Sequence, residues 1–139
     1  MLFSKFDGAG NDFILIDTRD EQITLSERQV AHLCHRRFGI GADGLMTLRN
    51  AHGNYDFEMR YYNSDGRLAS MCGNGGRCIT VFAHLLGLGT INANGHKTFR
   101  FLGPDGEHTS EIITWNEQAD MGIVRLGMQR KIICDEVYK

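Results

Sequence analysis

The sequence predicts an α+β fold in which a mostly antiparallel, curved sheet, or partial barrel, wraps around a central apolar helix. Apolar residues cover most of the circumference of a predicted helix over about 73–86, which is typical of a helix buried inside a protein. Hairpin signals follow it: a strand over 98–102, a turn over 103–106, a strand that ends near Trp115 and a strand over 121–126. Because strands and helices do not alternate regularly, α+β is favoured over a doubly wound parallel sheet.

The first half of the chain contains two predicted strands and one predicted helix. Residues 12–17 (DFILID) form a short buried strand, and residues 55–62 (YDFEMRYY) alternate between apolar and polar side chains, as a half-buried strand does. Between them we expect a helix over about 25–37, which begins at a capping box and ends at a glycine. The residues assigned to that helix are Thr24 and Glu27 for the capping box, Val30, Leu33, Cys34 and Phe38 for the apolar face, and Gly39 for the end.

Length and charge restrict the class of protein. With 139 residues the chain has room for one domain, which we expect to span 1–139. The net charge is −2 and no basic run is present, so the sequence has no electrostatic signature for nucleic acid or an anionic membrane. The longest apolar stretches fall short of the roughly 20 residues that cross a bilayer. The opening residues lack the charged head and apolar core of a signal peptide, so we expect a cytoplasmic protein.

The segment 71–78 (MCGNGGRC) is the part of the sequence that predicts chemistry. Cys72 comes directly before the predicted central helix, where backbone N–H groups lack helical partners and the helix dipole is positive. Both features favour a thiolate over a thiol. The glycines that follow leave the backbone bare, so the same N–H groups can hold a ligand carboxylate. A reactive thiol beside a carboxylate cradle suits a reaction at a carbon next to a carboxyl group.

Other interpretations of the cysteines are weaker. Cys34, Cys78 and Cys134 are best interpreted as small core residues. A phosphatase loop requires five residues between Cys and Arg, but four separate Cys72 from Arg77. The Gly-Lys-Ser/Thr of a phosphate-binding loop is missing. No cysteine or histidine pair has the spacing of a structural zinc site, so we expect no metal.

Four motifs, in order along the chain, resemble the signatures of the diaminopimelate epimerase family. They are residues 8–13 (GAGNDF), 39–44 (GIGADG), 63–66 (NSDG) and 71–78 (MCGNGGRC). The resemblance implies the inversion of the α-carbon of diaminopimelate, from the LL form to the meso form, for lysine and cell-wall synthesis. It also implies that no pyridoxal phosphate, metal or other cofactor takes part, because one cysteine removes the α-proton and a second delivers a proton to the opposite face.

Individual roles follow from the resemblance, residue by residue. Cys72 matches the first catalytic cysteine, and Asn11 and Asn63 match side chains that hydrogen-bond the substrate. Gly73 and Asn74 match groups that bind around the reacting α-carboxylate. Taken without the resemblance, Asn11 and Asn63 are more simply interpreted as turn residues. Gly44 stands where some members carry a glutamine that contacts substrate, so no role is assigned there.

The resemblance covers only half of the family's usual length. The family fold has two similar lobes with the active site between them, and this chain resembles the amino-terminal lobe. We expect the carboxy-terminal lobe, which carries the partner cysteine in the family, to be absent and the chain to be inactive alone. Three alternatives stay open: a homodimer or other self-association that pairs two copies of Cys72, a related amino-acid racemase, or a non-catalytic amino-acid-binding or thiol module.

Overall fold

The computed structural model describes residues 2–20, 23–128 and 131–139, which form two helices and a nine-stranded sheet. The elements, in chain order, are β1 (Ser4–Gly8), β2 (Asn11–Asp17), α1 (Glu27–Cys34), β3 (Gly44–Arg49), β4 (Phe57–Asn63), α2 (Gly73–Leu85), β5 (Thr90–Ile91), β6 (Lys97–Gly103), β7 (Gly106–Asn116), β8 (Met121–Met128) and β9 (Lys131–Tyr138). Neither described helix is long and apolar enough to cross a membrane.

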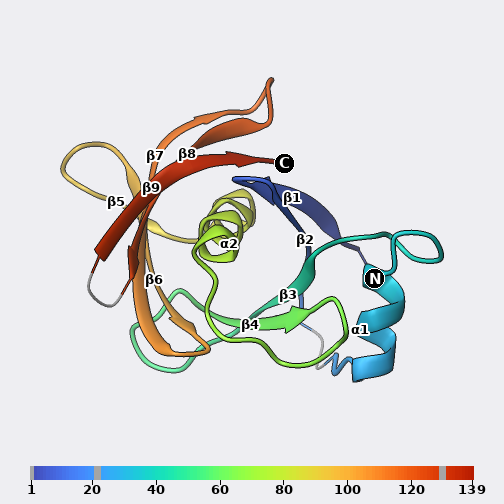
Figure 1. The fold of residues 1–139 in the computed structure, drawn as a ribbon. Coiled ribbons are helices and arrows are strands. Elements are labelled where there is room, and N and C mark those ends of the chain that lie inside the picture. Colours follow the sequence, from blue (N-terminus) through green and yellow to red (C-terminus); the bar gives the residue numbers. More distant parts are fainter. Residues whose placement is uncertain (1, 21–22, 129–130) are drawn as a thin grey trace.

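The sheet closes into a barrel around α2 (Figure 1). Its strand order is β4-β3-β2-β1-β9-β8-β7-β6-β5, and an additional pairing between β4 and β6 completes the ring, with β5 outside it. The β2–β3 and β4–β6 pairs are parallel and all other pairs are antiparallel. The predicted class, a mostly antiparallel curved sheet around a central helix, is therefore confirmed, and the wall forms a closed ring.

The inner faces of the strands pack on α2 and form the main core. Residues 75–83 of α2 are all buried, because strands surround the helix on every side. The helix ends where predicted, with Leu86 at its C-cap and Gly87 in the left-handed region at φ +84°. Phenylalanines from both halves of the barrel meet in this core, and the Phe57 and Phe101 rings stack with centroids 4.8 Å apart.

Helix α1 lies outside the barrel and covers part of its outer face (Figure 1). A second, smaller core fills the space between helix and sheet; its members are Ile14, Ile16, Val30, Cys34, Ala42, Leu45 and Tyr62. The strand predicted over 55–62 begins later in the structure, at Phe57, and Tyr55 lies before it. Its side chains still point to alternate faces at the end, where Tyr61 lies in the main core, but Tyr62 on the opposite face is buried in the smaller core and not exposed.

The prediction for α1 was wrong at both ends. The capping box is formed by Ser26 and Gln29 and not by Thr24 and Glu27: the Gln29 N–H donates to Ser26 Oγ at 3.1 Å, and the Ser26 N–H donates to Gln29 Oε1 at 2.9 Å. The helix stops at Cys34, because the backbone of the next residue is extended.

The residues expected at the end of α1 lie beyond the helix. Phe38 is 72% exposed and stacks on the His35 ring instead of facing the core. Gly39 packs against the end of the helix, where a Cβ would lie 2.0 Å from the carbonyl oxygen of His32. Gly39 therefore lets the chain fold back over the last turn of α1 but does not cap it.

Candidate active site at the start of the central helix

Cys72 is the N-cap residue of α2, as the sequence predicted. Its backbone is extended, with φ −120° and ψ 126°, and its carbonyl oxygen accepts the first helical hydrogen bond from the Gly76 N–H at 2.9 Å. Its side chain makes no capping hydrogen bond and is half-buried against the main core. Cys72 is therefore a partly buried residue at the positive end of the helix dipole, beside N–H groups that have no partner within the helix.

The first turn of α2 is pressed closely against strand β1. A Cβ on Gly8 would lie 2.9 Å from the Cys78 sulfur and 3.1 Å from the carbonyl oxygen of Asn74. A glycine at this position therefore lets the strand approach the helix. This close packing holds Gly73 and Asn74, the two residues that follow Cys72, in a fixed position against the barrel wall.

Three neighbouring strands bring the other predicted site residues to one end of the barrel. Gly44, at the start of β3, pairs with Phe13 near the start of β2 and with Asn63 at the end of β4. Asn11 begins β2, so Asn11 and Asn63 belong to the same end. The side chain of Asn63 is exposed, and its carbonyl oxygen accepts from the Gly66 N–H at 2.9 Å in the predicted turn.

A hydrogen bond joins Asn11 directly to the start of α2. The Asn74 side-chain amide donates to Asn11 Oδ1 at 2.5 Å, and the Asn11 amide donates to Asp43 Oδ2 at 3.1 Å. Within the described part of the chain, no such bond links the Asn63 side chain to either asparagine. The structure thus connects Asn11 with Asn74 and places Asn63 at the same end of the barrel.

Gly44 has no room for a side chain because Tyr61 occupies the space. A Cβ at Gly44 would lie 2.6 Å from Cε1 of Tyr61 and 2.8 Å from the carbonyl oxygen of Tyr62. Burial raises the pKa of Tyr61 to about 12, and negative charge on Cys72 and on Asp43 adds to the rise. Tyr61 is therefore a neutral hydroxyl group that fills the space beside Gly44.

Sequence reasoning missed two residues that contact the asparagines. Asp43 was included only as part of the motif 39–44, and Arg77 only as a spacing marker in the motif 71–78. The Arg77 guanidinium donates to Asn74 Oδ1 although the residue is almost completely buried. An arginine in a helix that the sequence predicts to be buried was the available signal, because a buried charge requires a partner.

The remaining cysteines are separate from this site. Burial raises the pKa of the Cys34 thiol to about 11 and raises that of Cys78 further. Cys134, expected in the core, is exposed on β9, so that prediction was wrong. Cys72 and Cys78 are both free thiols, which gives no support to a redox pair.

Thiol alkylation of the folded protein at neutral pH is expected to separate the four cysteines into two classes. Cys72 and Cys134 should react with iodoacetamide, because both reach solvent and Cys72 lies at a helix start. Cys34 and Cys78 should be protected, since both are buried and their raised pKa values leave little thiolate. Peptide mass spectrometry measures each site, and urea-unfolded protein, in which all four should react, is the control. Alkylation of Cys78 as fast as Cys134 would contradict the packing described for α2.

A charged cluster supports the Asn11 end of the site. The Asp12 carboxylate accepts from both terminal nitrogens of Arg36 at 2.8 and 3.0 Å and from Lys5 Nζ at 2.8 Å. These bonds, Arg36 first, hold the pKa of Asp12 well below its usual range. Asp12 follows Asn11 directly, so the ion pairs fix the start of β2.

Acid is expected to destabilise the fold through this cluster. Because the pKa of Asp12 is lower in the folded than in the unfolded protein, its contribution is complete above about pH 4 and is lost as the pH falls further. Urea unfolding at pH values between about 5 and 3 should show a smaller loss of stability for Asp12→Asn than for the wild type. Asp65→Asn is the control, because that carboxylate only caps the Arg67 N–H in an exposed turn. Equal pH slopes for wild type and Asp12→Asn would contradict this role.

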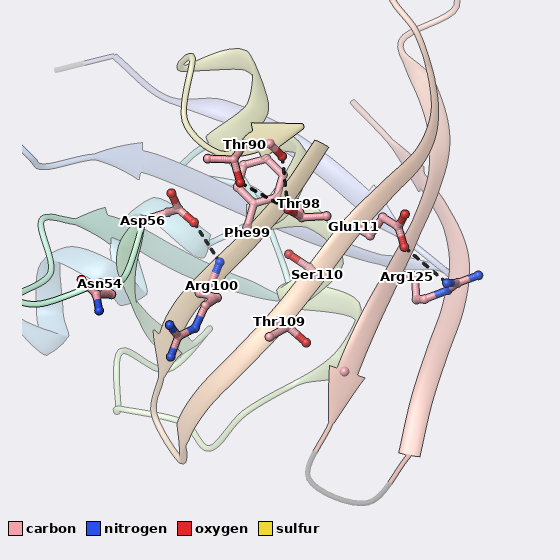
Figure 2. A pocket seen from close by; sticks show the side chains of 11 residues that line it. Asn54, Asp56, Thr90, Thr98, Phe99, Arg100, Thr109, Ser110, Glu111 and Arg125 are labelled. Atoms are coloured by element: carbon pink, nitrogen blue, oxygen red, sulfur yellow. Dashed lines mark hydrogen bonds and ion pairs between the residues drawn. The ribbon is translucent and has the colours of Figure 1, made fainter. Parts of the chain in front are cut away.

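A pocket of about 440 Å³ lies elsewhere, on the outer wall of the barrel (Figure 2). It lies over β6, β7 and β8, and none of the predicted site residues lines it. Its arginines already have acidic partners: Arg100 pairs with Glu107 at 2.7 Å and Arg125 with Glu111 at 3.3 Å. No cluster of three or more potential metal ligands occurs among the described residues.

Solved structures with this fold include racemases and epimerases. A probable proline racemase from Agrobacterium radiobacter has a TM-score of 0.65 at 12% identity, over 91% of this chain and 41% of that chain. A hydroxyproline epimerase from Agrobacterium vitis has a TM-score of 0.65 at 12% identity, over 91% of this chain and 40% of that chain. A PhzF-family phenazine biosynthesis protein from Bacillus anthracis has a TM-score of 0.59 at 17% identity, over 89% of this chain and 38% of that chain. These similarities establish the fold.

The chain belongs to the diaminopimelate epimerase family, whose model matches residues 3–127. The diaminopimelate epimerase of Chlorobaculum tepidum is 48% identical over 105 residues, which are 76% of this chain and 39% of that protein. The diaminopimelate epimerase of Flavobacterium psychrophilum is 47% identical over 113 residues, 81% of this chain and 41% of that protein. The chain therefore spans about two-fifths of the length of these relatives.

Proposed function

We propose that this chain, residues 1–139, is one lobe of a diaminopimelate epimerase and supplies one of its two catalytic cysteines. The observation that carries the proposal is the position of Cys72, a partly buried cysteine at the N-cap of a buried helix, within a chain of this family. The complete enzyme would convert LL-diaminopimelate to the meso form for lysine and cell-wall synthesis.

The residues at the start of α2 suit proton transfer at an α-carbon. The Cys72 thiolate would take the α-proton and become a thiol, while the C–H electron pair passes toward the substrate carboxylate. That developing charge requires donors placed in advance. The N–H groups of Gly73 and Asn74, which lack helical partners, would supply them, and the Asn11 and Asn63 side chains would orient the substrate.

Inversion requires a second group on the opposite face of the same carbon. A second thiol would donate a proton there and become the thiolate, so that protons and charges balance over the reaction. None of the other three cysteines can take this part, because Cys34 and Cys78 are buried and Cys134 is exposed on β9 away from α2. A second lobe is therefore required, and the 139-residue chain is expected to be inactive alone.

The test is incubation with LL-diaminopimelate in deuterated water. The isolated chain should give neither meso product nor α-deuterium. A fusion of the chain to the remaining three-fifths of the Chlorobaculum tepidum relative should give both. Efficient epimerisation by the chain alone would overturn the half-site proposal and favour a homodimer, which sedimentation analysis would then detect. A folded fusion that racemises proline but ignores diaminopimelate would overturn the proposed substrate.

A further inference from the structure

Two asparagine side chains at the candidate site form a directed chain of hydrogen bonds between an anion and a cation. The Asn11 amide donates to Asp43 Oδ2 at 3.1 Å, and the Asn74 amide donates to Asn11 Oδ1 at 2.5 Å. The Arg77 guanidinium donates to Asn74 Oδ1. The chain thus links a loop before β3, the start of β2 and the first turns of α2.

The charged ends determine the direction of this chain. An ionised carboxylate can only accept, so Asn11 has to present its NH2 group to Asp43, and its oxygen then faces Asn74. A guanidinium can only donate, so Asn74 has to present its oxygen to Arg77, and its NH2 group then faces Asn11. Reversing either amide would bring two acceptors or two donors together.

From this arrangement we propose that Arg77 and Asp43 are positioning residues that lock the orientation of Asn74 and Asn11. Each locked amide uses one N–H within the chain and retains one N–H for a ligand. Two fixed donors beside the start of a helix suit a carboxylate. The importance of these donors for catalysis rests on the proposed function, but the locking itself does not.

The burial of Arg77 supports a role beyond packing. Its side chain is 2% exposed, its nearest ionic contact among the described residues is Asp135 at 3.8 Å, and its Nε has no hydrogen-bond partner. Removing a guanidinium from water is costly unless strong pairing compensates for it. Among the described residues this arginine is incompletely paired, and its one side-chain hydrogen bond goes to Asn74, two residues after Cys72.

At the other end of the hydrogen-bond chain, the Asp43 carboxylate is also held in place by a charged partner. Asp43 accepts from Arg36 at 2.9 Å and from the backbone N–H of Asp12 at 3.3 Å. Its side chain is 40% exposed, so its replacement removes the anionic end without opening the core. Asp43→Asn therefore tests the chain of hydrogen bonds without leaving a cavity in the core.

The test is the side-chain amide NMR signals of the 139-residue chain without substrate. Asp43→Asn should shift the signals of Asn11 and also those of Asn74, whose hydrogen bonds go to Asn11 and Arg77 and not to Asp43. Asp56→Asn is the matched control, because that carboxylate accepts the Arg100 backbone N–H on the outer wall, and it should leave both asparagines unchanged. Unchanged Asn74 signals in Asp43→Asn would overturn the proposal, whether or not the protein is an epimerase.

Activity of the active fusion provides the second readout. Arg77→Met should lower kcat/KM about ten- to a hundredfold, the effect of losing a hydrogen bond to a charged group, with part of the loss as a raised KM. Arg77→Lys, which keeps a cationic donor, should recover part of it. Partial unfolding alone would lower kcat without raising KM, so an unchanged KM in folded Arg77→Met would overturn the positioning role. If neither the wild-type fusion nor any variant is active, the proposed function fails. The NMR experiment then still tests whether the two asparagines are locked in orientation.

Discussion

Replacing Cys72 by serine in the active fusion is expected to lower epimerisation by about a thousandfold, within the range that a positioned acid–base group contributes. Serine keeps the size of the side chain, but its hydroxyl does not ionise near neutral pH and cannot act as the base. Chiral analysis of the product and loss of α-deuterium incorporation both measure the effect.

The matched control for this change is Cys134→Ser. It makes the same atomic replacement at an exposed position on β9, outside the site, and activity should stay within about twofold of wild type because surface changes are usually small in effect. A Cys72→Ser fusion that retains wild-type activity would exclude this thiol as the base.

Phe57→Ala is expected to cause the largest loss of stability. Phe57 is fully buried, stacks on Phe101 and pairs with it in the β4–β6 contact that completes the barrel. Truncating a buried phenylalanine costs about 3–5 kcal/mol, a large share of the roughly 5–15 kcal/mol that stabilises a typical domain. Urea unfolding followed by circular dichroism measures the change.

Phe38→Ala is the control for this loss. It removes the same atoms from a ring that is 72% exposed, so the free energy of unfolding should change by less than about 1 kcal/mol. Equal midpoints for Phe57→Ala and wild type would mean that the β4–β6 contact does not hold the barrel together.

The central helix, and the position of Cys72 at its start, could be predicted because their signals are local. An apolar circumference identifies a buried helix without knowledge of its neighbours, and glycines after Cys72 mark the place where a helix begins. The start of α1 was ambiguous for an equally local reason. Thr24 with Glu27 and Ser26 with Gln29 both satisfy the capping pattern, and only packing of Val30 against the sheet distinguishes them.

Residues defined by tertiary contacts were not predictable. Strand β3 has no polar alternation to reveal it, because it is covered by α2 on one face and by α1 on the other. The role of Arg77 depends on Asn74 and, through it, on Asn11, which is distant in sequence. Nothing in the spacing of these residues indicates that their side chains form one chain of hydrogen bonds.

The closure of the barrel has a consequence for how the protein is made. The first strand pairs with the last, through Asp7 with Tyr138 and Gly8 with Val137, so the ring cannot form until β9 has left the ribosome. Helix α2 emerges earlier, before β6 to β9. Its apolar surface therefore stays exposed until the strands that cover it have been synthesised. Nascent chains of this protein should therefore fold late and be sensitive to aggregation while they are being synthesised.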